Sequence, residues 1–143
     1  MKTEYLLIDK SILPDYFELV LNVDDILLHE KLSVQAACEK AGISRSTYYK
    51  YKDKIIRPSK DFGKKLTISL SYKDSPLNLS KIFSLLDTIK QDVLSIYMDN
   101  PVNNMALIKI TISNKSKDLE ALDVINKIRE LTFIEKADIL RME

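Results

Sequence analysis

The stretch AGISRSTYYKY (residues 41–51) contains the features that decide the fold of the first part of the chain. Gly42 is one of only two glycines in the 143 residues. Glycine adopts the left-handed conformation that ends a helix at little cost, and Ser44 is a favoured N-cap residue for a following helix. The stretch therefore predicts the end of one helix, a tight turn at Gly42, and another helix that runs from Ser44 through Tyr51 or as far as Ile55.

The residues before this stretch predict two helices. Pro14 and the acidic residues after it are typical of a first helical turn, and apolar residues recur at helical spacing over residues 17–31. Ser33 is placed to cap a second, alanine-rich helix at about residues 34–40. The segment EYLLID (residues 4–9) predicts a short strand or an extended arm before the first helix.

Helical spacing separates an inward and an outward face on the third predicted helix. Tyr48, Tyr51 and Ile55 fall at i, i+3 and i+7, so we expect them to pack inward. Arginine forms paired hydrogen bonds with guanine or phosphate, and lysine and hydroxyl side chains commonly contact phosphates. The candidate DNA-binding residues are those left at its start and on its outward face: Ser44, Arg45, Ser46, Tyr49, Lys50 and Lys52.

Charge is unevenly distributed along the chain, although the net charge is only +1. Residues 1–39 contain three Lys against eight Asp and Glu, whereas residues 40–65 contain nine Lys and Arg against two Asp. Residues 66–143 are nearly balanced, with ten basic and eleven acidic side chains. The basic segment is what binding to a phosphate backbone would require, and its alternative interpretation is a solvated basic linker.

The helix, glycine turn and polar helix together resemble the helix-turn-helix of Hin-type recombinases and many small repressors. The small residues of the second helix, such as Ala37 and Cys38, suit a close helix crossing, and Ile43 suits an apolar anchor of the turn. The resemblance implies double-stranded DNA as a partner, with the last helix in the major groove. The alternative is a three-helix motif that serves packing or protein contact.

The remaining sequence predicts a second domain. RPSKDFGKK (residues 57–65) contains a proline, the second glycine and several basic side chains, which is typical of a linker. Beyond it, alternating and helical apolar patterns predict the order βαββαβ, a ferredoxin-like arrangement. We therefore predict an α+β protein with a helix-turn-helix domain at 1–57, a linker at 58–65 and a sheet domain at 66–143.

The second helix of this predicted sheet domain comes from DLEALDVINKIREL (residues 118–131). Its apolar residues fall on a spacing that is close to helical. We expect its inward side to carry Leu122, Ile125, Ile128 and Leu131.

The βαββαβ order and the loop DSPLNLSKI (residues 74–82) resemble an ACT domain, a small-molecule sensor of amino-acid metabolism. The resemblance implies a homodimer, formed by sheets side by side or by helix against helix, with a small amino acid ligand near the loop between the first strand and helix. It assigns Asp74, Leu77, Asn78 and Leu79 as candidate ligand residues. Leu77 stands where the family pattern has glycine, so the domain is either a sensor or a dimerisation module without a ligand.

The whole chain resembles the PheB-like, ACT-domain-containing proteins, some of which carry a chorismate mutase label. The resemblance rests on ILP (residues 12–14), GISRSTYYKYKD (residues 42–53) and the final domain. It implies a DNA-binding regulatory protein; the alternatives are a regulatory or interaction subunit that binds no DNA and, less favoured, a chorismate mutase. A mutase needs Arg, Lys and Glu converging on a dianionic substrate, whereas the basic residues here follow the third helix and the linker.

Composition limits the chemistry available to the chain. With one cysteine, Cys38, and one histidine, His29, the sequence predicts no disulfide, no clustered metal site and no Cys–His catalysis. We expect Cys38 to be buried and His29 to face solvent. No apolar run approaches the roughly 20 residues of a membrane span, and the N-terminus lacks a signal-peptide pattern. The expected protein is cytoplasmic, with no cofactor, no catalytic residue and no membrane partner.

Overall fold

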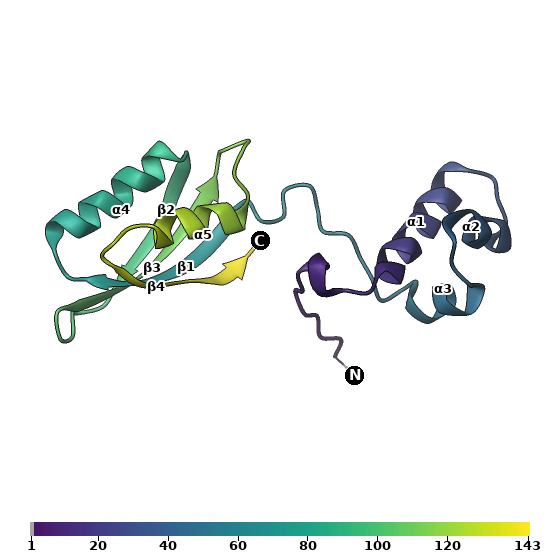
Figure 1. The fold of residues 1–143 in the computed structure, drawn as a ribbon, viewed down its shortest axis with the longest axis horizontal. Helices are drawn as coiled ribbons and strands as arrows, with labels where there is room; N and C mark the ends of the chain where they lie inside the picture. Colours follow the sequence, from purple (N-terminus) through teal and green to yellow (C-terminus); the bar gives the residue numbers. More distant parts are fainter. Residues whose placement is uncertain (1) are drawn as a thin grey trace. The chain divides into compact units, whose positions relative to one another are not determined.

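The computed structural model describes residues 2–143, which form two compact units (Figure 1). The first unit ends at Pro58 and the second begins at Ser59. Each unit has an apolar core of its own, and the two cores share no residue. Among the described residues, no helix is both long enough and apolar enough to cross a membrane.

The first unit consists of a 3-10 turn and helices joined by short connections. Its elements are η1 (Lys10–Ile12), α1 (Asp15–His29), α2 (Val34–Ala41) and α3 (Arg45–Tyr51). The side chain of Ser33 accepts a hydrogen bond from the Ala36 N–H and so caps α2. Gly42 follows α2 with φ 82° and ψ 35°, which is the left-handed conformation predicted for this glycine.

Small and aromatic side chains form the core of the first unit. Its buried residues are Val20, Val23, Ala37, Cys38 and Tyr48. Cys38 is buried as predicted, and this burial raises the pKa of its thiol. His29, at the end of α1, is exposed, also as predicted.

At each end of the first unit, the structure matches one of two alternatives predicted from the sequence. Residues 4–9 form no strand, because the first unit offers no neighbouring strand to pair with their backbone, and the side chains of Tyr5 and Leu6 are 76% and 86% exposed. The segment is therefore the alternative that was predicted, an extended arm. The helix α3 ends at Tyr51 and does not reach Ile55, although Ile55 still packs against the core.

The second unit is an antiparallel sheet with two helices. Its elements are β1 (Lys65–Lys73), α4 (Pro76–Thr88), β2 (Gln91–Met98), β3 (Met105–Asn114), α5 (Ala121–Arg129) and β4 (Ile134–Met142). This order confirms the predicted βαββαβ arrangement, and the strands lie in the order β2-β3-β1-β4. Both helices cover the same face of the sheet (Figure 1).

The core of the second unit lies between the sheet and its helices. Alternate residues of β1, from Leu66 to Tyr72, are buried, because successive side chains of a strand point to opposite faces. Their partners on β3 are buried as well, as in the pair Ile68 and Ile110. Ile82 and Leu86 of α4 pack against this apolar layer.

The buried side of α5 corrects one prediction. The buried residues are Ala121, Val124, Ile125 and Ile128, which follow the i, i+3, i+4 and i+7 spacing of one helix face. Ile125 and Ile128 were predicted correctly, and Leu131, after the helix, is half-buried. Leu122 was not: it lies next to Ala121 in sequence, about 100° around the helix, and its side chain is 54% exposed.

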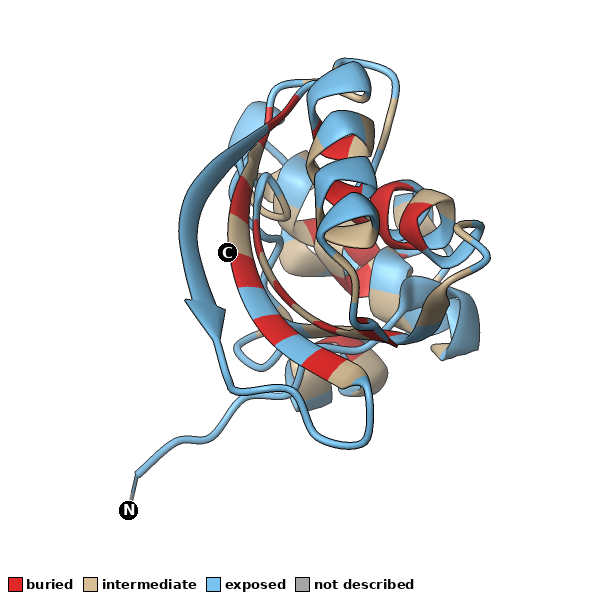
Figure 2. Ribbon diagram, turned by 90° about the vertical axis from the view of Figure 1, so that its left-hand side faces the viewer, coloured by how far each residue is buried: buried red, intermediate tan, exposed pale blue. Residues whose placement is uncertain are grey.

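The edge strand β2 is exposed along almost its whole length (Figure 2). Val93, Ile96 and Met98 pair with residues of β3 whose side chains are buried under the helices, so they lie on the same face of the sheet. Nevertheless they remain 39%, 43% and 51% exposed. The outer edge of the second unit therefore presents uncovered apolar surface.

Candidate functional site

The turn before α3 fixes where that helix begins. The N–H groups of Gly42 and Ile43 both donate hydrogen bonds to the carbonyl oxygen of Cys38, at 2.9 and 3.0 Å. The Ser44 side chain accepts a hydrogen bond from the Thr47 N–H at 3.2 Å and donates one to Thr47 Oγ1 at 2.8 Å. Of the predicted DNA-binding residues, Ser44 is thus placed as the N-cap, with its hydroxyl group already engaged.

Two tyrosines hold α3 against α1. The Tyr48 hydroxyl donates a hydrogen bond to Asp24 Oδ1 at 2.6 Å, and the Tyr48 ring is buried. Burial and the hydrogen bond to the Asp24 carboxylate both raise the pKa of Tyr48. The Tyr51 ring packs edge-on against Phe17, with ring centroids 5.0 Å apart. These contacts turn one side of α3 inward, as predicted, and leave the opposite side free.

The opposite side of α3 carries the predicted outward residues. Arg45, Ser46, Tyr49 and Lys50 are exposed, while Lys52, at the C-cap, is half-buried. Lys52 Nζ lies 5.8 Å from the centroid of the Tyr49 ring, a cation–π contact. The structure thus brings these residues together on and next to one surface of the first unit.

In the part of the chain that the structure describes, the basic side chains of this surface are not paired with carboxylates, unlike some others in the basic segment. Elsewhere in the basic segment, the side chains of Lys40 and Arg57 form salt bridges with Glu30 and Asp25, at 2.6 and 2.9 Å. Within residues 2–143, the side chain of Lys50 forms no salt bridge, and the same holds for Arg45 and Lys52. The free cationic groups are therefore available to an anionic partner.

A hollow of about 350 Å³ adjoins this surface. It is lined by Tyr16, Leu19, Gly42, Ile43, Ser44, Thr47, Lys50 and Tyr51. Sequence reasoning did not identify Tyr16 as a candidate residue, because it belongs to α1 and lies outside the motif. The feature that could have found it is its position in the first turn of α1, which packing brings close to the last turn of α3.

The predicted ligand residues of the second unit lie in the loop between β1 and α4 and in the first turns of α4. The Asn78 side-chain amide donates a hydrogen bond to the Lys73 carbonyl oxygen at 2.8 Å, so it closes the loop on itself. The Asp74 N–H donates to the Asn104 carbonyl oxygen at 2.7 Å, and its carboxylate is exposed. Leu77, in the first turn of α4, has a negative φ and is 62% exposed, so it extends into solvent without backbone strain.

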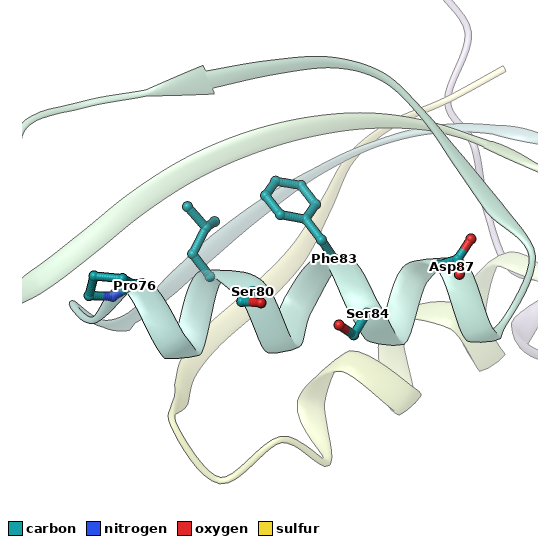
Figure 3. A pocket seen from close by; sticks show the side chains of 6 residues that line it. Pro76, Ser80, Phe83, Ser84 and Asp87 are labelled. Atoms are coloured by element: carbon teal, nitrogen blue, oxygen red, sulfur yellow. The ribbon is translucent and has the colours of Figure 1, made fainter.

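A second hollow, of about 540 Å³, runs along the flank of α4 (Figure 3). It is lined by Pro76, Leu79, Ser80, Phe83, Ser84 and Asp87. Of the four predicted ligand residues, only Leu79 lines it, whereas Asp74, Leu77 and Asn78 do not. Within residues 2–143, no three His, Cys, Asp or Glu side chains are grouped to hold a metal ion.

Comparison with known proteins gives relatives over the whole chain. A UPF0735 ACT domain-containing protein of Clostridium kluyveri is 36% identical over 146 residues, covering 100% of both chains. Another, of Clostridium acetobutylicum, is 35% identical and covers 98% of this chain and 92% of the relative. No protein-family model matches. Among solved structures, the ACT domain of the GTP pyrophosphokinase of Chlorobium tepidum matches with a TM-score of 0.45 and 14% identity, covering 53% of this chain and 96% of that domain.

Proposed function

Because the chain belongs to the UPF0735 family of ACT domain-containing proteins, we propose that it is a regulatory protein that binds double-stranded DNA through α3 and forms a homodimer through its ACT domain. The observation that carries the DNA-binding part is the outward face of α3. Its arginine and lysine side chains are exposed and form no salt bridge within residues 2–143.

The arrangement of α2, the Gly42 turn and α3 supports a helix-turn-helix function for the first unit. In such motifs the second helix enters the major groove and its outward side chains reach base edges and phosphates. The guanidinium of Arg45, at the start of α3, is placed to contact a guanine edge or a phosphate, and Lys50 to contact the backbone. The buried Tyr48 fixes the rotation of α3 that presents these side chains.

A salt titration of duplex DNA binding tests this proposal. We expect the affinity to fall steeply as salt rises, because each neutralised phosphate releases counterions. Replacing Arg45 or Lys50 by alanine should weaken binding and make the dependence on salt shallower. Lys117→Ala, which removes an exposed lysine of the second unit, is the matched control and should change little. Failure of the wild-type protein to bind duplex DNA, or binding that ignores salt, would refute the proposal.

The homodimer is proposed to form through β2 and the adjoining flank of α4. An edge strand normally carries charges or prolines that prevent pairing with another chain, but Asp92 is the only charged residue of β2. Pairing two copies of β2 about a two-fold axis would cover the exposed Ile96 and Met98 together with Phe83 of α4. The dimer would then carry two copies of α3, which suits a near-palindromic DNA site.

Substitution at the middle of β2 tests the dimer. Ile96→Lys places a charge on the proposed interface, and because Ile96 is 43% exposed in the single chain, the fold should survive. We expect the variant to sediment as a monomer at concentrations where the wild-type protein sediments as a dimer. Leu140→Lys, at an exposed apolar position of the other edge strand, is the control and should leave the dimer intact. A dimeric Ile96→Lys protein would exclude this interface.

The loop between β1 and α4 is the proposed place for an amino acid ligand. The Asp74 carboxylate is exposed and could bind the ammonium group of an amino acid, whereas the Asn78 amide already closes the loop. Thermal unfolding in the presence of each standard amino acid would detect binding as a raised midpoint. A stabilisation that Asp74→Asn abolishes supports a sensor. An unfolding midpoint that no amino acid raises would indicate that the ACT domain is a dimerisation module without a ligand.

A second candidate function is an interaction subunit that binds a protein partner and no DNA. The exposed apolar arm favours it, because Tyr5, Leu6 and Leu7 have no cover within the first unit. This function predicts that Arg45→Ala and Lys50→Ala leave partner binding unchanged. Neither candidate includes catalysis, so conversion of chorismate to prephenate by the purified protein would contradict both.

A further inference from the structure

The hollow beside α3 combines hydroxyl groups and a cation, and no carboxylate lines it. The side chains of Tyr16 and Tyr51 bring two phenol groups to it, and Lys50 brings an ammonium group. Lys50 also belongs to the outward face of α3, so the hollow borders the surface proposed to meet DNA. Hydroxyl and ammonium groups are hydrogen-bond donors, and a site that combines them without a carboxylate suits an anion.

The two tyrosines act as a pair. Their rings lie with centroids 5.6 Å apart. The neighbouring Tyr16 side chain is the largest cause of the lowered pKa of Tyr51. When two neighbouring hydroxyl groups share one hydrogen bond, one of the two hydrogens is still free to donate to another acceptor.

Lys50 completes the group. Its Nζ atom lies 5.3 Å from the centroid of the Tyr51 ring, which keeps the ammonium group beside the phenol pair. Hydrogen bonding and charge from Lys50 also contribute to the lowered pKa of Tyr51. This lowering means that the surroundings of the Tyr51 oxygen favour negative charge.

We propose that Tyr51, Lys50 and Tyr16 together bind one phosphate of the DNA backbone at the edge of the groove that α3 enters. This inference rests on the proposed DNA binding and adds Tyr16 and Tyr51 to its contacts. In it, the Tyr51 hydroxyl and the Lys50 ammonium donate to the phosphate oxygens, and the Tyr16 ring positions Tyr51. Because the contact joins α1 to α3, it fixes the orientation of the first unit on the duplex without reading sequence.

Removal of single hydroxyl groups tests the inference in the full-length protein. Tyr51→Phe and Tyr16→Phe keep both rings and their packing, which thermal unfolding would verify. We expect Tyr51→Phe to weaken binding about tenfold and Tyr16→Phe to weaken it less. For each variant, the loss should be the same on duplexes of different sequence, because a phosphate contact reads no base. Tyr5→Phe, which removes an exposed hydroxyl of the arm, is the control and should bind like the wild-type protein.

The dependence on salt separates the neutral donors from the cation. A hydroxyl contact releases no counterion, so Tyr51→Phe should bind more weakly with an unchanged salt slope. Lys50→Ala should reduce the slope by about 1. Duplexes with one methylphosphonate linkage, which lacks the phosphate charge, would then locate the contact. At the contacted linkage the loss of affinity should be smaller for Tyr51→Phe than for the wild-type protein, because only the Lys50 contact is left to lose.

The outcomes distinguish this inference from the function on which it rests. If the wild-type protein binds duplex DNA and both phenylalanine variants bind it as tightly as the wild-type protein does, the phosphate site is refuted and the DNA-binding proposal stands. If their losses differ from one DNA sequence to another, the contact is to a base and the phosphate site is again refuted. If the wild-type protein does not bind duplex DNA, the proposed function itself fails.

Discussion

Tyr48, Tyr49 and Tyr51 are close neighbours in the chain, yet their side chains occupy three different environments. Tyr48 is buried with its hydroxyl on Asp24, Tyr49 is 53% exposed, and Tyr51 is half-buried at the border between core and surface. Helical spacing was enough to predict the inward position of Tyr48 and the outward position of Tyr49. It was not enough to predict the pairing of Tyr51 with Tyr16, because that contact depends on how α1 crosses α3.

The left-handed turn at Gly42 leads to the first prediction. A Cβ atom added there would meet no atom within 4 Å, so the only cost of a side chain is the backbone conformation, with φ +82°. Gly42→Ala should lower the free energy of unfolding of the first unit by about 1 kcal/mol, and Gly42→Asn by less, because asparagine tolerates this conformation better. Urea unfolding followed by circular dichroism would measure both; equal stability of all three proteins would contradict the prediction.

The buried hydroxyl of Tyr48 leads to the second prediction. Its pKa is raised from an ordinary value of 10.0, so above about pH 10 the unfolded chain loses this proton while the folded chain keeps it. The stabilisation from this group is therefore complete below pH 10 and is lost as pH rises further. Tyr48→Phe should lower stability at pH 8 by about 1 kcal/mol, since Asp24 loses its donor, and should weaken the decline above pH 10.

Urea unfolding at pH 8 and pH 11 would measure the effect of Tyr48→Phe. Tyr5→Phe is the control, because the side chain of Tyr5 is 76% exposed. This control should keep the wild-type stability at pH 8 and the wild-type decline at high pH. A Tyr48→Phe protein with the same decline as the control would show that Tyr48 is not the group responsible.

At the scale of elements, the order along the chain could be predicted and the exact buried faces could not. Strand alternation and helical spacing are local properties of the sequence, which is why the order βαββαβ and the start of α3 at its serine cap were predicted. The inward face of α5 was assigned partly wrongly, because Leu122 is apolar and yet lies outside the face that begins at Ala121. The hollows beside α3 and α4 were not predicted either, because each is lined by residues whose relative positions depend on packing.

The two sides of α5 give the third prediction. Ile128 is fully buried, so Ile128→Ala removes packed apolar volume and should lower the free energy of unfolding of the second unit by about 3 kcal/mol. Leu122 lies on the outer side of the same helix, and Leu122→Ala should change stability by no more than about 0.5 kcal/mol. Thermal or urea unfolding of the two variants would measure both changes. A loss of stability in Leu122→Ala well above this value would mean that a partner chain covers Leu122.

At the scale of the whole molecule, two cores without a shared residue imply two units that fold by their own packing. The proline, the glycine and the basic side chains of residues 57–65 predicted a linker, because linkers are marked by composition. DNA and ligand partners are not marked in this way, since their recognition depends on side chains brought together by folding.

Independence of the units is the fourth prediction. A protein that starts at residue 59 should fold with the helix and sheet content of the second unit, because its core residues all lie beyond that point. Its unfolding midpoint should match that of the second unit in the full-length chain when both are compared at equal concentration. Circular dichroism and urea unfolding would measure this, and an unfolded fragment would show that the first unit is required.

The exposed strand β2 has a consequence for the synthesis of the chain. Its only neighbour in the sheet is β3, which follows it in sequence, so a nascent β2 leaves the ribosome with both edges free. Its unprotected apolar side chains are then available to other nascent chains on the same messenger, and aggregation competes with folding. The yield of soluble protein should therefore depend on expression temperature and chaperone supply, even where the activity of the folded protein stays the same.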